Sequence, residues 1–322
     1  MTDRSSDGTH SDATEPTAWR VQTDRREVLT HTDTEGAVEA LDRLDSGVDA
    51  TGDERTVPES RVGESPSEAV RSFLRCVPSL LSWAEANGRE FPWRPTDDPW
   101  RVYVVEVLLQ RTRAEAVASI YPEFFETYPT PEAIVEADES DLIECVSPLG
   151  FGRRRASILR SVARAVVEDH DGAVPRDAPA LREPDGIGPY TARATAVFGH
   201  GTPLGLVDVN TARIFGRVFG REVPRRADES DPAHLLADSL TPSIPRVARA
   251  FNLALLDLGA MVCTPSDPNC SSCPLVSACA HARECRSENA DGTDGDGTGT
   301  DTAPDGCKGV SSADARPEGD EA

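Results

Sequence analysis

The chain has 322 residues, with 56 acidic and 33 basic side chains and a formal net charge of −23. That length allows one large or two small domains. Because the sequence holds no apolar run of roughly 18 residues and no signal-peptide pattern, it indicates neither a membrane-spanning nor a secreted protein. We expect a cytoplasmic, intracellular protein with reduced thiols and no membrane partner.

The acidic residues are concentrated at the two ends. Residues 1–66 hold 16 acidic and 7 basic residues, residues 286–322 hold 10 and 3, and the middle, 67–285, holds 30 and 23. Both ends are poor in large apolar groups and cannot bury enough surface to fold alone. We expect an acidic, largely disordered extension at 1–66 and a disordered acidic tail at 286–322. Only the stretch 19–44 could hold a short strand and helix.

Basic residues are almost all arginine. Lys308 is the only lysine, and the other 32 basic residues are Arg. An acid surplus with Arg in place of Lys is typical of a salt-adapted proteome and a GC-rich genome. The competing interpretation is a chain that avoids nucleic acid, since negative charge opposes binding to phosphates. High salt screens that repulsion within a few Å, so the charge does not exclude DNA.

Residues 67–285 carry an all-helical pattern. Apolar residues recur at helical spacing in 70–77, 102–109, 158–166 and 251–258. Pro and Gly interrupt the pattern between these segments, and no convincing β alternation is present. The sequence therefore predicts an all-α protein of about ten short helices.

A carboxylate interrupts the apolar segment 102–109. Glu106 lies between Val105 and Val107, where burial of a charged carboxylate is costly unless it is paired or protonated. A raised pKa would make it a proton donor near neutral pH. The alternative is an outward-facing Glu on an amphipathic helix.

Two glycines precede a predicted helix at Gly186-Ile187-Gly188-Pro189-Tyr190. Glycine permits positive φ and a close approach of the backbone to a ligand. Free N–H groups at a helix start can bind an anion, most simply a phosphate. Alone, the pattern also fits an ordinary turn between helices.

A second carboxylate, Asp208, lies just before a helix predicted to run to Phe219, with Asn210 as its N-cap. The helix dipole favours an ionised carboxylate at that place, although a second capping residue is the alternative. One carboxylate held ionised and one held protonated are what glycosidic cleavage through an oxocarbenium-like state requires. We extend that principle from sugars to a base–deoxyribose bond.

Four cysteines follow within a short segment, spaced C-x6-C-x2-C-x5-C: Cys263, Cys270, Cys273 and Cys279. A structural zinc site usually has two C-x2-C pairs far apart. One compact loop is instead typical of a [4Fe–4S] cluster. The spacing favours the cluster over zinc, and a disulfide pair is a third alternative.

Together the Gly-x-Gly hairpin, the loop 201–205 leading to Asp208, and the cysteine loop resemble the helix-hairpin-helix (HhH-GPD) DNA glycosylases in order and spacing. This superfamily includes endonuclease III, the adenine glycosylases of A/G mismatches and the thymine/uracil mismatch glycosylases. The resemblance covers residues 67–285. It implies an all-α, two-lobed fold, with a lobe of about six helices at 100–202 and a cluster lobe formed by 67–99 and 203–285.

The resemblance also implies roles for individual residues. Asp208 would stabilise the oxocarbenium ion or activate water, and the four cysteines would hold a structural [4Fe–4S] cluster. The target base of duplex DNA would be flipped into the groove between the lobes, where a monomer would act on it. Glu106, which would contact the base, and Tyr190 would be the other catalytic residues. DNA contacts would come from Gly186, Ile187, Gly188 and the wedge residues Gln110 and Arg111.

Endonuclease III-type enzymes also cut the strand, through a Schiff-base Lys that follows the second hairpin glycine by two residues. Here that position is Tyr190, and 67–285 contains no Lys. We therefore expect a monofunctional glycosylase. An endonuclease III-like glycosylase with lyase activity is retained as an alternative.

The segment 105–112 resembles the helix that carries the base-contacting Glu of the mismatch enzymes. Adenine glycosylases end it in a Gln-Gln-Thr wedge, which here is Gln110-Arg111-Thr112, and add a C-terminal domain for 8-oxoguanine that the 37 residues after Cys285 could not form. Thymine/uracil enzymes lack that domain and commonly have Tyr at the position of Tyr190. We expect excision of a mismatched base opposite guanine, with thymine or uracil favoured over adenine. An adenine glycosylase without the added domain is the first alternative.

Two acidic residues depart from the family pattern. Asp185 replaces the usual Pro before the hairpin glycine, and Asp267 lies where relatives usually have a basic residue beside the second cysteine. Negative charge near a phosphate path weakens DNA binding at low salt. Salt adaptation would explain both, and so would a non-catalytic iron–sulfur DNA-binding protein.

Overall fold

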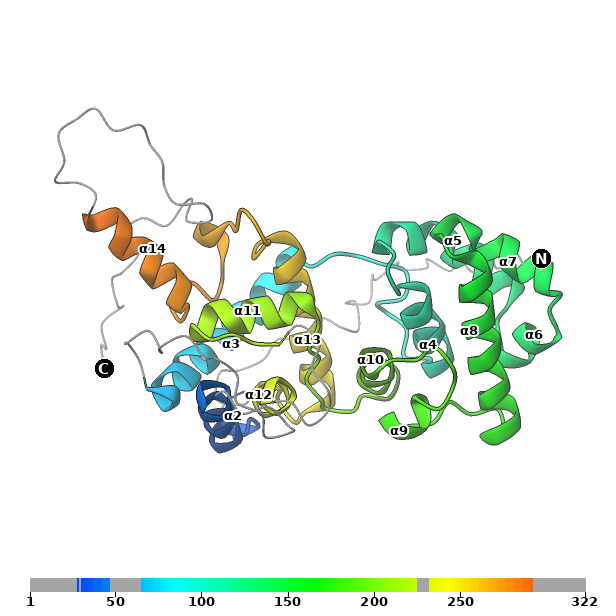
Figure 1. The fold of residues 1–322 in the computed structure, drawn as a ribbon, viewed down its shortest axis with the longest axis horizontal. Coiled ribbons are helices and arrows are strands. Elements are labelled where there is room, and N and C mark those ends of the chain that lie inside the picture. The colour runs from blue at the N-terminus through cyan, green and yellow to red at the C-terminus, as the bar shows by residue number, and fades with distance from the viewer. Residues whose placement is uncertain (1–27, 29, 47–64, 225–231, 292–322) are drawn as a thin grey trace, which may run out of the picture.

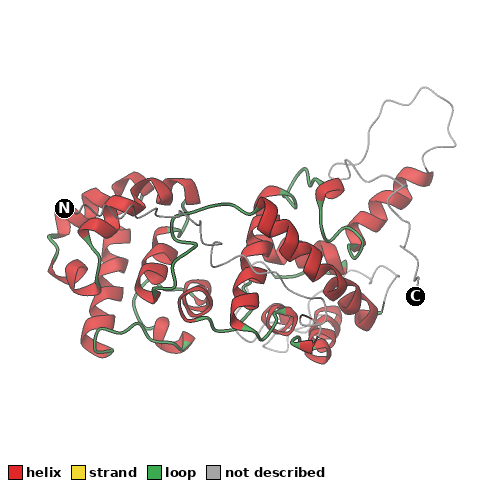
Figure 2. Cartoon of the chain, turned by 180° about the vertical axis from the view of Figure 1, so that it is seen from behind, coloured by secondary structure: helices red, strands yellow, loops and turns green. Residues whose placement is uncertain are grey.

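The computed structural model describes residues 28, 30–46, 65–224 and 232–291. Every regular element in this part of the chain is a helix (Figure 2). No helix among these residues has both the length and the apolar composition needed to cross a bilayer. The elements fall into two lobes at opposite ends of the long axis in Figure 1.

One lobe, here called the hairpin lobe, contains seven α-helices and two short helical turns. The α-helices are α4 (Pro99–Leu108), α5 (Ala114–Thr127), α6 (Pro131–Glu136), α7 (Glu139–Val146), α8 (Gly152–Arg164), α9 (Ala178–Leu181) and α10 (Pro189–His200). The turns are η1 (Ser147–Leu149) and a π-helical turn, η2 (Ala165–Asp169).

The hairpin lobe has its own hydrophobic core, which extends from Trp100 to Ala196. Tyr103 and Phe124 are among its fully buried side chains. The Tyr103 hydroxyl donates to the carbonyl of Leu181 at 2.5 Å, which satisfies its buried polar atom. Helix α4 is thus enclosed by its neighbours, and any polar side chain on it has to be accommodated in a low-dielectric interior.

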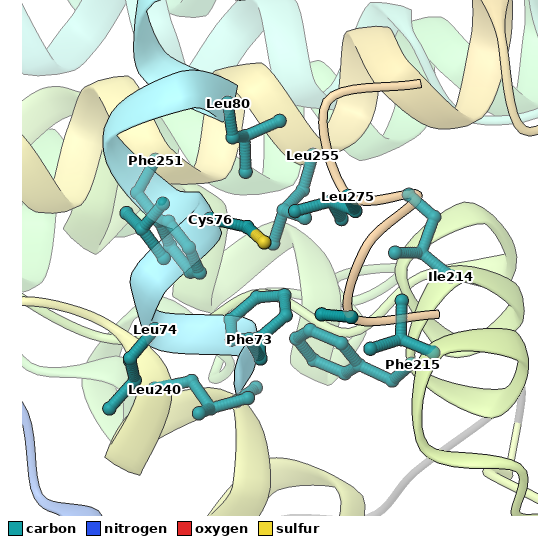
Figure 3. Packing of buried hydrophobic residues seen from close by; sticks show 14 of the residues in the cluster. Phe73, Leu74, Cys76, Leu80, Ile214, Phe215, Leu240, Phe251, Leu255 and Leu275 are labelled. Carbon is teal, nitrogen blue, oxygen red and sulfur yellow. The ribbon is translucent and has the colours of Figure 1, made fainter. Parts of the chain in front are cut away.

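The second lobe, here called the cysteine lobe, contains six helices and a short 3-10 turn within the described residues. They are α2 (Thr34–Ser46), α3 (Pro66–Asn87), α11 (Val209–Phe219), α12 (Pro232–Leu240), α13 (Pro245–Met261), η3 (Cys270–Ser272) and α14 (Ala280–Asp291). Phe73 of α3 is its central side chain, within 6.3 Å of the rings of Phe215, Phe219 and Phe251. Figure 3 shows this packing and places Leu275, from the cysteine loop, against the same core.

A small apolar cluster joins the lobes: Val102, Ala194, Val197, Phe198, Leu206 and Leu253. It brings α4 and α10 of the hairpin lobe against α13 of the cysteine lobe. The chain passes between the lobes twice, at 88–98 and at 201–208, and both passages are visible in Figure 1. The expectation of an all-α, two-lobed fold is confirmed.

Part of the N-terminal extension is folded onto the cysteine lobe. Helix α2 packs on α12, and Arg221 donates to both carboxylate oxygens of Asp45 at 2.8 Å. The helix is stabilised in an acidic segment because three of its apolar residues, Ala37, Ala40 and Leu41, are fully buried, and Val38 and Leu44 pack against the same core. The helix expected within 19–44 is therefore present, whereas residues 19–27 and 29 lie outside the described residues. At the other end, α14 continues to Asp291, into the segment 286–322 that the sequence predicts to be a disordered tail.

Candidate active site between the two lobes

A pocket enclosing about 1080 Å³, part of it open to solvent, lies at the junction of the lobes. Its walls come from α4, α10, α13, the start of α11 and the passage 88–98. Three residues that the sequence singles out line it together: Glu106, Tyr190 and Asp208. They are separated by up to 102 positions in the sequence, and the fold places all three around one cavity.

Asp208 is held as the N-cap of α11. Its Oδ1 accepts from the backbone N–H groups of Asn210 at 2.9 Å and Thr211 at 2.7 Å, and its Oδ2 accepts from the Asn210 side-chain amide at 2.8 Å. All three groups are donors, so they fix the position of both carboxylate oxygens. The prediction that Asn210 is the N-cap is wrong, because α11 begins two residues earlier, at Val209.

The chain segment that leads to Asp208, residues 204–207, is fixed by polar contacts with both lobes. Leu206 N–H donates to the Asn252 side chain at 2.8 Å, and the Asn252 amide donates to the Leu204 carbonyl at 2.9 Å. Gly205 N–H donates to Asp238 at 2.7 Å, and Arg193 of α10 forms an ion pair with the same carboxylate. The carboxylate of Asp208 is therefore presented by a rigid segment.

Glu106 lies on the inner face of α4 and is 8% exposed. Burial raises its pKa from 4.5 to about 8, and the nearby positive charge of Arg249 opposes that rise. At neutral pH the side chain is therefore mainly a neutral carboxylic acid, able to donate a hydrogen bond or a proton into the pocket.

Tyr190 lies at the first turn of α10, between the two carboxyl groups. Burial raises the pKa of its phenol well above 10, and the negative charges of Glu106 and Asp208 raise it further. Tyr190 is therefore a neutral hydroxyl at all working pH values. It can donate a hydrogen bond, but it has no amine with which to form a Schiff base.

Arg249, on α13, is a pocket residue that the sequence reasoning did not identify. Its guanidinium donates to the carbonyls of Phe198, Arg94 at 2.9 Å and Thr96 at 3.1 Å, so it ties α13 to α10 and to the passage 88–98. Burial lowers its pKa to about 10, which leaves it charged at neutral pH. Its place among apolar residues of α13 is the feature of the sequence that could have indicated it.

A buried ion network holds the passage 88–98. Asp257 of α13 is fully buried and accepts two hydrogen bonds from Arg94 at 2.7 Å and one from the Arg89 guanidinium at 2.7 Å. Both arginines lie over the ring of Phe91, which stacks on Trp93 at 4.8 Å. The network places two aromatic rings on the pocket wall. The sequence reasoning missed it, although Asp257 interrupts an apolar helix in the same way as Glu106.

The predicted hairpin is present between α9 and α10, and its two glycines differ in backbone conformation and in the space around them. Gly186 has φ +88°, and an added Cβ would lie 2.5 Å from Cγ1 of Ile158. Gly188 has φ −91° and no atom near its Cβ position, so the expectation that both glycines serve positive φ is wrong for Gly188. Ile187 is 9% exposed, and its N–H donates to the Pro184 carbonyl at 3.3 Å, so this N–H is engaged within the turn.

The predicted wedge residues lie beside the pocket rather than in it. Gln110 donates to the Gly186 carbonyl at 3.2 Å, and Arg111 adopts a left-handed φ of 55°. With Phe151, which has φ 54° and is 69% exposed, they line a separate hollow of about 420 Å³. Arg155 supports this surface by donating to the carbonyls of Val107 at 2.8 Å and Leu108 at 2.9 Å.

The four cysteines line a second pocket, whose other walls are mainly aliphatic. Burial raises the pKa of Cys270, that of Cys273 to about 12 and that of Cys279 to about 11, and their mutual proximity raises these values further. If these thiols were deprotonated, their negative charges would have to be balanced by a bound cation. The thiols surround the pocket without converging on a point: among the described residues, no three His, Cys, Asp or Glu side chains are grouped as ligands of one ion.

One chain of hydrogen bonds links this loop to the first pocket. Arg213 donates to the Cys263 carbonyl at 2.7 Å and to the Asn210 side-chain oxygen at 2.8 Å, while Asn210 donates to Asp208. On the next turn Arg217 donates to the Cys263 sulfur at 3.3 Å. The cysteine loop is therefore connected to the Asp208 carboxylate through Arg213 and Asn210.

Comparisons with known proteins agree with the resemblance drawn from the motifs. The HhH-GPD superfamily of base excision DNA repair proteins matches residues 104–230. The thymine/uracil-DNA glycosylase of Methanothermobacter thermautotrophicus is 33% identical over 209 residues, which cover 65% of this chain and 94% of that protein.

An adenine DNA glycosylase of Mycobacterium tuberculosis is 38% identical over 205 residues, which cover 61% of this chain and 64% of that protein. The solved structure of a thermostable thymine-DNA glycosylase superposes with a TM-score of 0.63 at 32% identity, covering 69% of this chain and all of that one. Identity is higher with the adenine enzyme, while the match extends over more of the thymine/uracil enzyme.

Proposed function

Because the chain belongs to the HhH-GPD superfamily of base excision DNA repair proteins, we propose that it is a DNA glycosylase that removes thymine or uracil mispaired with guanine. The observation that carries this proposal is the single pocket shared by Glu106, Tyr190 and Asp208. It combines a carboxylate stabilised by three donors with a carboxyl group kept neutral by burial. This is the pairing that cleavage of a glycosidic bond requires.

The proposed mechanism begins with the target nucleotide turned out of the duplex into the pocket. The deoxyribose faces Asp208, whose carboxylate stabilises the positive charge that develops on the sugar as the bond to the base breaks. The base faces Glu106 and Tyr190, and both offer donors to its carbonyl oxygens. Water then adds to the sugar on the face of Asp208.

We propose hydrolysis without strand cleavage. The lyase reaction of endonuclease III-type relatives needs an amine at the position occupied here by Tyr190, and a neutral phenol cannot form a Schiff base. Incubation with abasic-site DNA and borohydride tests this point. We expect no efficient covalent adduct, and a trapped adduct would establish lyase chemistry.

An adenine glycosylase is the second candidate, and the 38% identity to the mycobacterial adenine enzyme favours it. The broader coverage of the thymine/uracil enzyme and the presence of Tyr190 favour the pyrimidine enzyme. Single-turnover assays in high salt decide between them, with duplexes that carry G·T, G·U, G·A and 8-oxoG·A pairs. We expect release of thymine and uracil, and release of adenine alone would contradict the proposal.

We also propose that Cys263, Cys270, Cys273 and Cys279 hold a [4Fe–4S] cluster, the group that a single compact four-cysteine loop suits. Four thiols that line one mainly aliphatic pocket, two of them buried, support this proposal. The cluster would supply a covalent cross-link for the loop, and no step of the reaction passes through it. Equal amounts of iron and acid-labile sulfide in purified protein, both lost in Cys273→Ser, would support it, whereas stoichiometric zinc would refute it.

Double-stranded DNA is the proposed partner, and we keep the expectation of a monomer. The hairpin Gly186–Gly188 opens directly into α10. The N–H groups at the first turn of that helix can therefore receive a phosphate of the DNA backbone. Sedimentation of the protein with one duplex, expected to give a one-to-one complex, checks the monomeric state.

A further inference from the structure

Four ionisable side chains line the base pocket together: Asp208, Tyr190, Glu106 and Arg249. Asp208 is fixed by three donors at the start of α11. Arg249, on α13, is fixed by the backbone carbonyls of Phe198, Arg94 and Thr96. With Glu106 and Tyr190 neutral, a negative and a positive charge of this set are held on different walls of the pocket.

The positive charge of Arg249 is not cancelled by an ion pair. Its hydrogen bonds go to three neutral backbone carbonyls, and in the described part of the chain no carboxylate is within ion-pair distance of it. Asp97 attracts it without touching it. The other arginines on the pocket wall differ, because Arg89 and Arg94 are both bound to Asp257.

Such a charge distinguishes two classes of leaving base. When the C1′–N1 bond to thymine or uracil breaks, its electron pair moves to N1 and spreads over O2 and O4, so the base departs as an anion. Adenine departs readily only after it gains a proton and carries positive charge. A half-buried cation beside the base stabilises the first and repels the second, and the lowered dielectric around it strengthens both effects.

We propose that Arg249 is a specificity-determining residue that selects pyrimidine leaving groups through its positive charge. This inference rests on the proposed glycosylase function and extends it to the chemistry of the departing base. Asp208 stabilises the positive sugar and Arg249 the negative base, so the two charges act on opposite ends of the breaking bond. Water supplies hydroxide to C1′, and its proton ends on the released base.

The test compares leaving groups rather than rates alone. Single-turnover release of uracil, thymine and 5-fluorouracil opposite guanine is measured for the parent, Arg249→Gln and Arg249→Lys. Arg246→Gln is the matched control, since Arg246 is exposed and lies about one turn earlier on α13.

Loss of the charge should slow uracil and thymine release by about 100-fold, the effect of removing one stabilising group. It should slow 5-fluorouracil release much less, because the fluorinated ring is the more acidic leaving group. Arg249→Lys keeps the charge with fewer carbonyl contacts and should keep the parent's ratio of uracil to 5-fluorouracil release even if it melts earlier. Arg246→Gln should behave as the parent.

Equal slowing of all three bases in Arg249→Gln, or a changed ratio in Arg249→Lys, would show that Arg249 acts only as a tether between elements and would overturn the inference. So would a parent that releases adenine faster than pyrimidines. A parent that releases no base from any duplex would overturn the glycosylase function itself. The two failures are therefore separate results.

Discussion

At the scale of single residues, two carboxyl groups in one pocket have very different surroundings. Asp208 accepts hydrogen bonds from three donors at the start of a helix. Glu106 has no such donors in the described part of the chain and lies between apolar residues of α4, where burial raises its pKa to about 8. Position in the fold, rather than residue type, thus supports the roles proposed for Asp208 as a charge stabiliser and for Glu106 as a donor.

Replacing Glu106 with Gln should remove a pH dependence of stability. The folded protein keeps the Glu106 proton between pH 4.5 and about 8, whereas the unfolded chain releases it. The parent therefore loses stability as the pH rises through this window, and the Gln variant does not. The advantage of Glu106→Gln should grow with pH by up to about 5 kcal/mol, since each pKa unit is worth about 1.4 kcal/mol.

Thermal melting of parent and variant at several pH values across this window measures the effect. A difference in melting temperature that stays constant from acid to alkaline pH would mean that Glu106 is not buried as a neutral acid. Glu132→Gln, which changes an exposed carboxylate at the start of α6, is a suitable control because it should show no such trend.

At the scale of elements, the hairpin before α10 lies between the surface proposed to contact DNA and the candidate active site. Its first glycine has a positive φ and lies against Ile158 of α8, and its carbonyl accepts from Gln110 at the end of α4. Its second glycine is the N-cap of α10, the helix that carries Tyr190. A change in the conformation of this turn should therefore alter both the surface formed by Gln110 and Arg111 and the pocket that contains Tyr190.

The two hairpin glycines should respond differently to alanine. Gly186→Ala combines a left-handed φ with a Cβ only 2.5 Å from the Ile158 side chain, so it should cost about 1–3 kcal/mol. Gly188→Ala has neither problem and should leave the melting temperature near that of the parent, while its added methyl group weakens DNA binding. Equal destabilisation by both changes would contradict the described turn.

The network around Asp257 gives a second prediction at this scale. Asp257→Asn would leave the fully buried Arg94 without its carboxylate, which should cost about 3–5 kcal/mol. Arg89→Ala keeps the bidentate Arg94–Asp257 pair and should cost much less, because Arg89 is 30% exposed. Chemical unfolding of both variants measures the difference. Similar losses would mean that Arg94 does not depend on Asp257.

These elements also show what could be predicted from the sequence. Periodicity and Pro/Gly breaks predicted an all-helical chain, and residue types with fixed local roles pointed to Gly186 and Asp208. Arg249 and Asp257 were missed because their roles depend on partners more than 150 positions away, which no local pattern reveals. The packing of α2 could not be predicted from residues 1–66 for a related reason. This acidic helix packs on α12, which lies about 190 residues later in the chain.

At the scale of the whole molecule, a chain that is expected to bind a polyanion carries a net charge of −23, most of it in residues 1–66 and 286–322. Self-repulsion destabilises a compact acidic protein at low salt, and screening relieves it. Basic residues on the pocket side, such as the half-buried Arg249 and the buried Arg94, are instead bound to specific partners. Salt should therefore change stability mainly by screening the repulsion between acidic side chains on the outer surface.

The melting temperature should rise as salt increases from about 0.1 M to about 1 M, by roughly 2–4 °C for each kcal/mol gained. Sucrose at matched osmolality is the control, because it stabilises by exclusion without screening charge. A melting temperature that falls with salt, or that rises equally with sucrose, would show that surface repulsion is not what limits the stability of this protein.

The most direct test of the account is base release by Asp208→Asn from a G·U duplex in high salt. Asn is a good N-cap, so the variant should fold as the parent does and still bind the duplex, while single-turnover uracil release falls by at least about 100-fold. Parent-like release by Asp208→Asn would contradict the assignment of the pocket between the lobes as the site of glycosidic bond cleavage.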